Sequence, residues 1–171
     1  MNIKQLEKNI IDMLIEQQIK LGYLKEVVRL YYPKKSVYAL LDVAEDREIL
    51  SEVEDSIFDK SGNIHIKSLK DGRICIEVSK ELGEYVHKNK PQNLFIEKLI
   101  ELIRNHCSIE DVFDLFKSES NQVYIEELKD SDFEYLVYFK DENPDDFYYC
   151  FNVEGKHVTY HRFTKIDYMM L

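Results

Sequence analysis

From Gln122 the period of the sequence pattern changes to two, in segments that end near Arg162, and this repeat constrains the fold more than any other feature of the chain. A period of two is typical of β-strands that bury one face, whereas the steps of three and four seen earlier in the chain are typical of helices. Most of the phenylalanines and more than half of the tyrosines lie between Tyr124 and Tyr168. We therefore expect four strands, at residues 122–127, 133–140, 147–153 and 156–162.

Helical periodicity dominates the chain before this point. Apolar residues between positions 3 and 21 fall on one stripe, and Gly22 follows as a stop signal. Residues 94–104 are apolar on most sides, which predicts a central, buried helix, and Ser108 with Asp111 resembles a capping arrangement for the next helix. The predicted fold class is therefore α+β, with N-terminal and central helices packed against a C-terminal antiparallel β-sheet.

A small β-hairpin is expected near residues 63–78, after the preceding helix breaks at Ser61-Gly62. A three-residue loop with Gly72 in a left-handed conformation would pair Ile66 with Ile76, and would bury the isoleucines of the two strands together. The same register pairs Ile64 with Val78. It leaves the following residues on the wetter face: His65, Lys67, Arg73, Cys75 and Glu77.

Length and charge bound the class of protein. At 171 residues the chain is long enough to bury a core without disulfides or metals, and we expect a single domain over residues 1–171. Its formal net charge of −10 repels nucleic-acid backbones, and no stretch approaches the ~20 apolar residues that cross a bilayer. The three cysteines form no CxxC pair, and the N-terminus has no secretory signal. We expect a cytoplasmic protein that binds neither nucleic acid nor membranes.

Residues 147–162 form a second predicted hairpin. With Glu154-Gly155 as a two-residue loop, Phe151 pairs with Val158 and Tyr148 pairs with His161. Alternation then sorts aromatic rings onto one face and hydrogen-bonding groups onto the other. The second face would carry Tyr138, Tyr148, Cys150, His157, Thr159 and His161.

This polar face is the candidate catalytic site. His161 or His157 would act as a general base near pH 7, and Tyr138 or Tyr148 would orient a substrate. Two other interpretations remain open: helices cover the face and satisfy each group locally, or the face is simply solvated. No metal site is predicted, because His157 and His161 would lie about 13 Å apart on one strand. The chain also lacks a glycine-rich phosphate loop and the common catalytic motifs, so no cofactor is predicted.

A second candidate surface lies near the N-terminus. Residues 26–32 are β-branched and aromatic, which predicts an extended segment that ends at Pro33. Exposed tyrosines beside an arginine are common anchors of protein interfaces. The candidate binding residues here are Tyr23, Arg29, Tyr31 and Tyr32, unless the extended segment instead serves to cover the core.

Two segments near the ends of the chain carry a family resemblance. The first is Leu21-Gly22-Tyr23 followed by Val28-Arg29-Leu30-Tyr31-Tyr32-Pro33, and the second runs from Tyr160 to Tyr168. They resemble the two ends of an uncharacterised family of small cytosolic bacterial proteins, over nearly the whole chain. The resemblance implies no assigned activity, cofactor or catalytic residue. It directs attention to Arg29, Tyr31, Tyr32, His161 and Arg162. Arg162 is therefore added to the candidate binding residues.

These patterns favour a non-enzymatic protein that binds another protein or assembles with itself. The reasons are the lack of a recognised catalytic constellation and the presence of aromatic surfaces without a basic footprint. One alternative is an enzyme of unrecognised type that uses the histidines and tyrosines of the C-terminal sheet. A further alternative is a small-ligand sensor, which would have a closed apolar pocket beneath that sheet.

Overall fold

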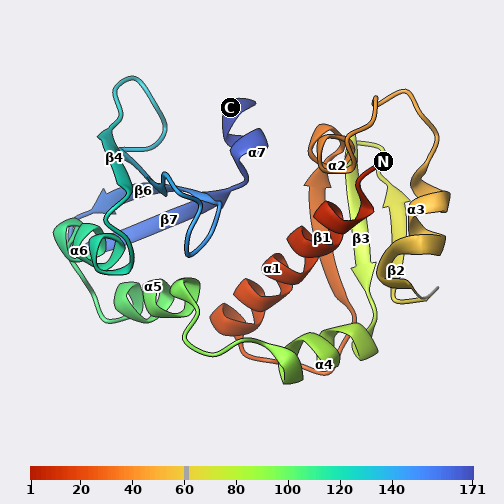
Figure 1. Cartoon of the computed structure of the whole chain (residues 1–171), viewed down its shortest axis with the longest axis horizontal. Coiled ribbons are helices and arrows are strands. Elements are labelled where there is room, and N and C mark those ends of the chain that lie inside the picture. The colour runs from red at the N-terminus through yellow and green to blue at the C-terminus, as the bar shows by residue number, and fades with distance from the viewer. Residues whose placement is uncertain (60–61) are drawn as a thin grey trace. The chain divides into compact units, whose positions relative to one another are not determined.

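The computed structural model describes residues 1–59 and 62–171, so the predicted helix break at Ser61 lies outside the described residues. The chain divides into two compact units, Met1–Pro91 and Gln92–Leu171. Each unit contains one antiparallel sheet and several helices (Figure 1). The predicted α+β class is confirmed. The single-domain assignment remains a prediction.

Over its described residues, 1–59 and 62–91, the first unit is a three-stranded sheet with four α-helices. The strands are β1 (Val28–Pro33), β2 (Ile64–Ser68) and β3 (Arg73–Val78), in the spatial order β1-β3-β2. The helices are α1 (Ile3–Leu21), α2 (Lys34–Leu41), α3 (Leu50–Ser56) and α4 (Lys80–Asn89), and a short 3₁₀ turn, η1 (Ile57–Asp59), follows α3.

The β2–β3 hairpin has the predicted register. Ile66 pairs with Ile76, and Ile64 pairs with Val78. Gly72 has a φ of 81°, as the bulged three-residue loop requires. The extended segment that precedes Pro33 becomes β1, which pairs with β3 and places Leu30 beside Ile76. The central strand, β3, is therefore hydrogen-bonded to a neighbouring strand along both of its edges.

The core of the first unit lies between this sheet and helices α1 and α2. Leu6, Ile10 and Leu14 form the buried stripe of α1. Opposite this stripe, the inner face of the sheet presents its aliphatic side chains and one tyrosine. The Tyr32 hydroxyl donates a hydrogen bond to Asn9 Oδ1 over 3.0 Å, which satisfies both groups inside the core.

The second unit is a four-stranded meander that follows two helices. The helices are α5 (Phe95–Arg104) and α6 (Ile109–Glu119), and the strands are β4 (Val123–Glu127), β5 (Tyr135–Phe139), β6 (Tyr148–Glu154) and β7 (His157–Phe163), in sequential order. A short helix, α7 (Lys165–Met169), ends the chain. None of the described helices of either unit is long and apolar enough to span a lipid bilayer.

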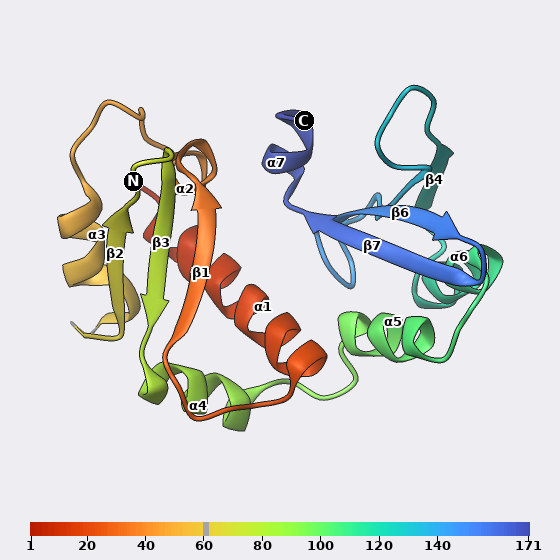
Figure 2. The ribbon, with the colours of Figure 1, turned by 180° about the vertical axis from the view of Figure 1, so that it is seen from behind.

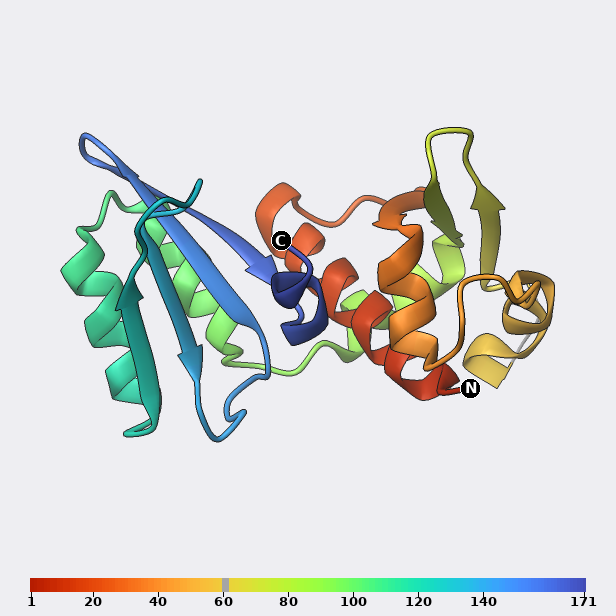
Figure 3. The same cartoon turned by 90° about the horizontal axis from the view of Figure 1, so that it is seen from above.

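Aromatic rings fill the core of the second unit. Helices α5 and α6 lie on one face of the sheet (Figure 3), and Phe116 of α6 is the centre of the contact. Its ring centroid lies 4.7 Å from that of Phe95 and 5.0 Å from that of Phe139. Tyr149 and Phe151 pack against the same ring. The predicted capping arrangement at the start of α6 is present as a capping box between Ser108 and Asp111.

The β6–β7 hairpin differs from the predicted register by two residues. Phe151 pairs with Tyr160 rather than Val158, and Cys150, rather than Tyr148, lies opposite His161. The strands extend to Glu154 and His157, so the turn is Gly155-Lys156, and Gly155 takes the positive φ of 63°. A shift of two residues preserves the face of every side chain. The sorting of rings and polar groups onto opposite faces is therefore as predicted.

Candidate functional site

One face of the β1-β3-β2 sheet carries no described helix of its own unit. Figure 2 shows the three strands in front of α1 and α2, with no helix drawn across them. Side chains alternate across a strand, so the residues between the buried positions project from this side. We call this surface the open face, and it comprises Arg29, Tyr31, His65, Lys67, Arg73, Cys75 and Glu77.

Glu77 organises two of the cations of the open face. Its carboxylate accepts a hydrogen bond from Arg29 Nε over 2.8 Å and another from Lys67 Nζ over 2.9 Å. Arg29 stands on β1, Lys67 on β2 and Glu77 on the strand between them. The bond from Arg29 and then the bond from Lys67 lower the pKa of Glu77 from its ordinary 4.5 to about 2. The carboxylate therefore stays ionised at neutral pH and fixes both cations.

Tyr31 and Arg73 form the second group on the open face. The Arg73 guanidinium lies over the Tyr31 ring, 5.3 Å from its centroid, and is also held by Asp71 through an Nε–Oδ2 hydrogen bond of 2.8 Å. Tyr31 is 53% exposed although it stands on a strand. An exposed aromatic ring backed by a fixed cation is a typical anchor of a protein interface.

Cys75 and His65 complete the surface. Cys75 lies on the open face as predicted, but it is buried rather than wet, because its strand neighbours Tyr31 and Lys67 flank its small side chain. His65 Nδ1 lies 2.9 Å from Glu54 Oε1 of α3. The other oxygen of Glu54 accepts the Ile66 N–H over 2.6 Å. Helix α3 therefore covers the edge of β2 and leaves the open face clear.

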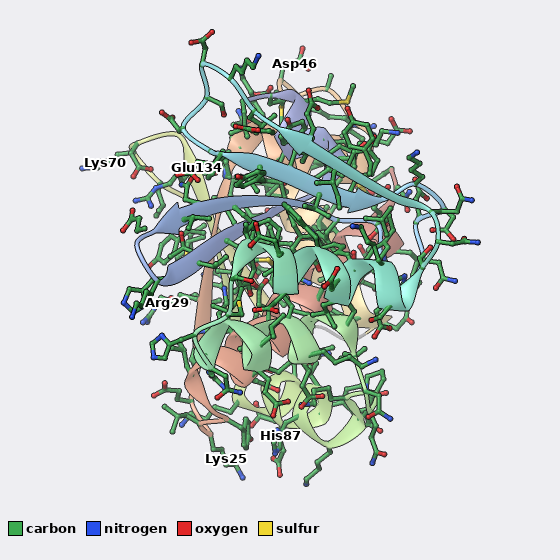
Figure 4. All side chains as sticks on the ribbon, turned by 90° about the vertical axis from the view of Figure 1, so that its left-hand side faces the viewer. Lys25, Arg29, Asp46, Lys70, His87 and Glu134 are labelled. Carbon is green, nitrogen blue, oxygen red and sulfur yellow. The ribbon has the colours of Figure 1, made fainter. Side chains whose placement is uncertain are left out.

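The structure separates the four residues of the predicted N-terminal surface. Arg29 and Tyr31 lie on the open face, whereas Tyr32 points to the opposite side of β1 and is only 7% exposed. Tyr23 precedes the strand and stacks on His87 of α4, with ring centroids 4.1 Å apart; Figure 4 labels His87. Two of the four residues therefore belong to one surface.

Five residues of the open face were absent from the predicted binding set. They are His65, Lys67, Arg73, Cys75 and Glu77. The hairpin register did place them on a wet face, which was the available signal. What the sequence pattern lacked was the pairing of β1 with β3, which brings this face beside Arg29 and Tyr31.

The predicted catalytic tyrosines form a stack on the outer face of the second sheet. The rings of Tyr138 and Tyr148 lie 4.2 Å apart and almost parallel, and Tyr124 extends the stack at 4.9 Å from Tyr138. Tyr168 of α7 contacts Tyr148 from the other side. Burial, followed by the neighbouring Tyr148, raises the pKa of Tyr138. These ring faces are occupied by one another, which is the arrangement of a structural cross-strand ladder.

The two predicted catalytic histidines do not come together. His161 packs on Phe133, with centroids 5.3 Å apart, whereas His157 stands at the hairpin turn and contacts His106 at 5.2 Å. Both imidazoles are exposed, and neither has a carboxylate or hydroxyl partner among the described residues. Tyr148 and His161 are diagonal neighbours on one face rather than a pair.

Arg162 lies on the inner face of β7, away from these histidines. Its guanidinium carbon stands 4.1 Å from the centroid of the Phe147 ring. Nearby, the Tyr149 hydroxyl donates a 2.6 Å hydrogen bond to Asp145 Oδ2. Burial raises the pKa of Asp145 and, together with the charge of Asp145, that of Tyr149. This cluster ties the β5–β6 loop to the sheet.

A groove between α5 and α6 was not foreseen. It is a shallow groove of about 550 Å³, and its lining includes Leu102, Leu115 and the acidic Asp114. It opens to solvent between two helices and does not lie beneath the sheet. The space beneath the sheet is filled by the rings around Phe116. Among the described residues, no three histidine, cysteine or acidic side chains converge on one point as a metal site would need.

Comparison with known proteins identifies a family but no activity. The chain matches no curated protein and no solved structure. A family described as "Domain of unknown function, E. rectale Gene description (DUF3877)" matches residues 3–171. This match spans both units, and the predicted membership of an uncharacterised bacterial family is confirmed. The chain belongs to this family of unknown function.

Proposed function

We propose that this chain is a non-enzymatic, cytoplasmic protein-binding module and that the open face is its docking surface. The observation that carries the proposal is Tyr31, an exposed ring on a sheet face that no described helix of its own unit covers, with cations held in fixed positions around it. Interfaces are enriched in tyrosine and arginine, because these side chains combine a large contact area with directional hydrogen bonds. Self-assembly through the same face is the homotypic form of this proposal.

The alternative of an enzyme has less support. General acid–base catalysis needs a positioned proton acceptor within hydrogen-bond reach of a substrate, usually in a concave site. His157 and His161 are exposed and contact rings instead of carboxylates. Tyr138 and Tyr148 use their ring faces on each other. A sensor with a closed apolar pocket beneath the sheet has no support from the aromatic packing there.

Site-specific cross-linking tests the proposal. A photoreactive phenylalanine analogue replaces Tyr31 in one variant and Tyr85 in the control, which is a 61% exposed tyrosine on α4 of the same unit. After irradiation in the cells that carry the gene, we expect a discrete protein adduct from position 31 and not from position 85. Equal labelling from both positions, or no adduct from position 31, would contradict a docking role for the open face.

A further inference from the structure

We infer that the open face recognises an extended, acidic segment of a partner protein, in which two carboxylates flank an apolar side chain. This inference rests on the proposed function and specifies the chemistry of the partner. It follows from the sign of the exposed charge, from the donors that remain free, and from the spacing of Arg29, Tyr31 and Arg73 on the sheet.

The projecting charge of the open face is positive, in a chain whose net charge is −10. The exposed fractions of the side chains are 58% for Arg29, 47% for Lys67 and 53% for Arg73. The carboxylate between the first two, Glu77, is only 19% exposed. At Arg29 and Lys67 an approaching partner therefore meets cations first, and the acid beneath them acts as an internal support. Asp71, which holds Arg73, is 51% exposed and offsets part of the charge at that end of the face. Figure 4 shows Arg29, and also Lys70 of the adjoining loop, pointing outward from the ribbon.

The cations hold unused hydrogen-bond donors in fixed positions. Arg29 contacts Glu77 through Nε, which leaves its two Nη groups for a ligand. Lys67 spends one donor on the same carboxylate, and Arg73 spends Nε and one Nη on Asp71. The two terminal nitrogens of Arg29 match the two oxygens of a carboxylate, whereas Arg73 has one terminal nitrogen left to donate. Because neighbouring acids already hold these side chains, binding would cost less side-chain entropy.

The spacing defines the segment that fits. Arg29 pairs with Glu77 and Pro33 pairs with Arg73, so the two arginines stand four residues apart along the sheet, with Tyr31 midway. Four residues of extended chain span roughly 13 Å. A partner strand that lies along β1 would present side chains of one face at every second residue. The matching pattern is acid–x–apolar–x–acid, with the apolar side chain on the Tyr31 ring.

The test compares two labelled peptides with the full chain by fluorescence anisotropy. One peptide carries the pattern Glu-x-Leu-x-Glu, and the other replaces both glutamates by glutamine. We expect the glutamate peptide to bind about tenfold more tightly, and the preference to shrink as salt rises from low to physiological strength. Arg29→Ala with Arg73→Ala should abolish the preference. Tyr31→Ala should weaken the binding of both peptides.

The matched control is Lys35→Ala with Lys80→Ala, which removes the same charge from helices α2 and α4 of the same unit. It should leave the preference intact, and circular dichroism should show the same fold for all variants. Equal affinity for the two peptides, or a preference that survives loss of Arg29 and Arg73, would overturn the inference. So would tighter binding of a single-stranded oligonucleotide of equal charge, or a dimer of the chain that closes the face. Failure here with a Tyr31-specific cross-link retained would reject the acidic segment and keep the docking surface.

Discussion

Neighbouring tyrosines of β1 show how strongly position within a two-residue repeat controls the environment of a side chain. Tyr31 and Tyr32 are adjacent and chemically identical, yet one is 53% exposed and the other 7%. The hydroxyl of the buried Tyr32 donates a hydrogen bond to Asn9, whereas the ring of the exposed Tyr31 lies beneath the Arg73 guanidinium. Residue type alone predicts an interface role for both, and only the face of the strand separates them.

Glu77→Gln should make the stability of the protein less dependent on acid. The folded-state pKa of Glu77, about 2, lies below its ordinary 4.5, so its ion pairs stabilise the native state fully above pH 4.5. That contribution to stability is lost as the pH falls from 4.5 through the folded-state pKa of Glu77, about 2. We expect the wild type to have a higher Tm than the variant at pH 7, and the difference to vanish towards pH 2. Glu127→Gln, at an exposed position on β4, should show no such convergence.

Tyr149→Phe should destabilise the native state by about 1–3 kcal/mol, the usual effect of leaving a half-buried acceptor without its donor. Tyr149 is fully buried, and its hydroxyl donates to Asp145 over 2.6 Å. Urea denaturation would measure the change. Tyr135→Phe removes a hydroxyl from a half-buried tyrosine of the neighbouring strand and should have little effect. The Phe147 N–H donates to the other oxygen of Asp145, Oδ1, and is unaffected by the substitution. A Tyr149→Phe variant as stable as the wild type would contradict the contribution assigned to the hydrogen bond on Oδ2.

At the scale of elements, local chemistry predicted most boundaries and short-range pairings. Ser79 caps α4, Ser108 caps α6, and Gly72 sets the β2–β3 register, all as their residue types predict. The β6–β7 turn shows the limit of this reasoning. Both Glu154-Gly155 and Gly155-Lys156 keep every side chain on its proper face, so alternation cannot choose between them. The structure pairs Glu154 with His157 and so selects the second turn.

Two glycines should respond with opposite signs to the same substitution. Gly155 has a φ of 63° in the hairpin turn, so Gly155→Ala should cost about 1 kcal/mol through backbone strain. Gly83 lies inside α4, and no atom outside its own helix and chain neighbours comes within 4 Å of an added Cβ. Gly83→Ala should therefore raise stability by up to about 1 kcal/mol. Thermal unfolding of the two variants side by side would measure both effects, and matching signs would contradict this account.

On the scale of the whole molecule, the chain contains two compact units, each with its own sheet and buried side chains. Only residues 90–94 connect α4 to α5. Units of this size bury a smaller fraction of their surface than the full chain would, so cooperation between them would add stability. If the chain is a single domain, as the sequence predicts, the two units should unfold together in one cooperative transition.

Differential scanning calorimetry tests the prediction of a single domain. A single domain should unfold in one transition, with equal calorimetric and van't Hoff enthalpies. Leu14→Ala and Phe116→Ala each empty a fully buried position, one in each unit, and should cost about 2–5 kcal/mol. In a single cooperative domain, both variants lower the midpoint temperature of the same transition. Two transitions, each moved by only one of the variants, would show two domains.

The amino-acid sequence by itself determined the helices, the strands, the α+β class and the face of nearly every strand residue, because these depend on periodicity, caps and turn residues within a few positions. Only the tertiary structure decided the pairing of β1 with β3, the register of β6 with β7, and the burial of Cys75 and Tyr32. These depend on contacts between residues that are far apart in the chain or on a choice between registers of equal local quality. The open face is a result of that kind: four separate sequence positions, Arg29, Tyr31, Lys67 and Arg73, become one surface because a strand formed before residue 34 adds to a hairpin formed after residue 63.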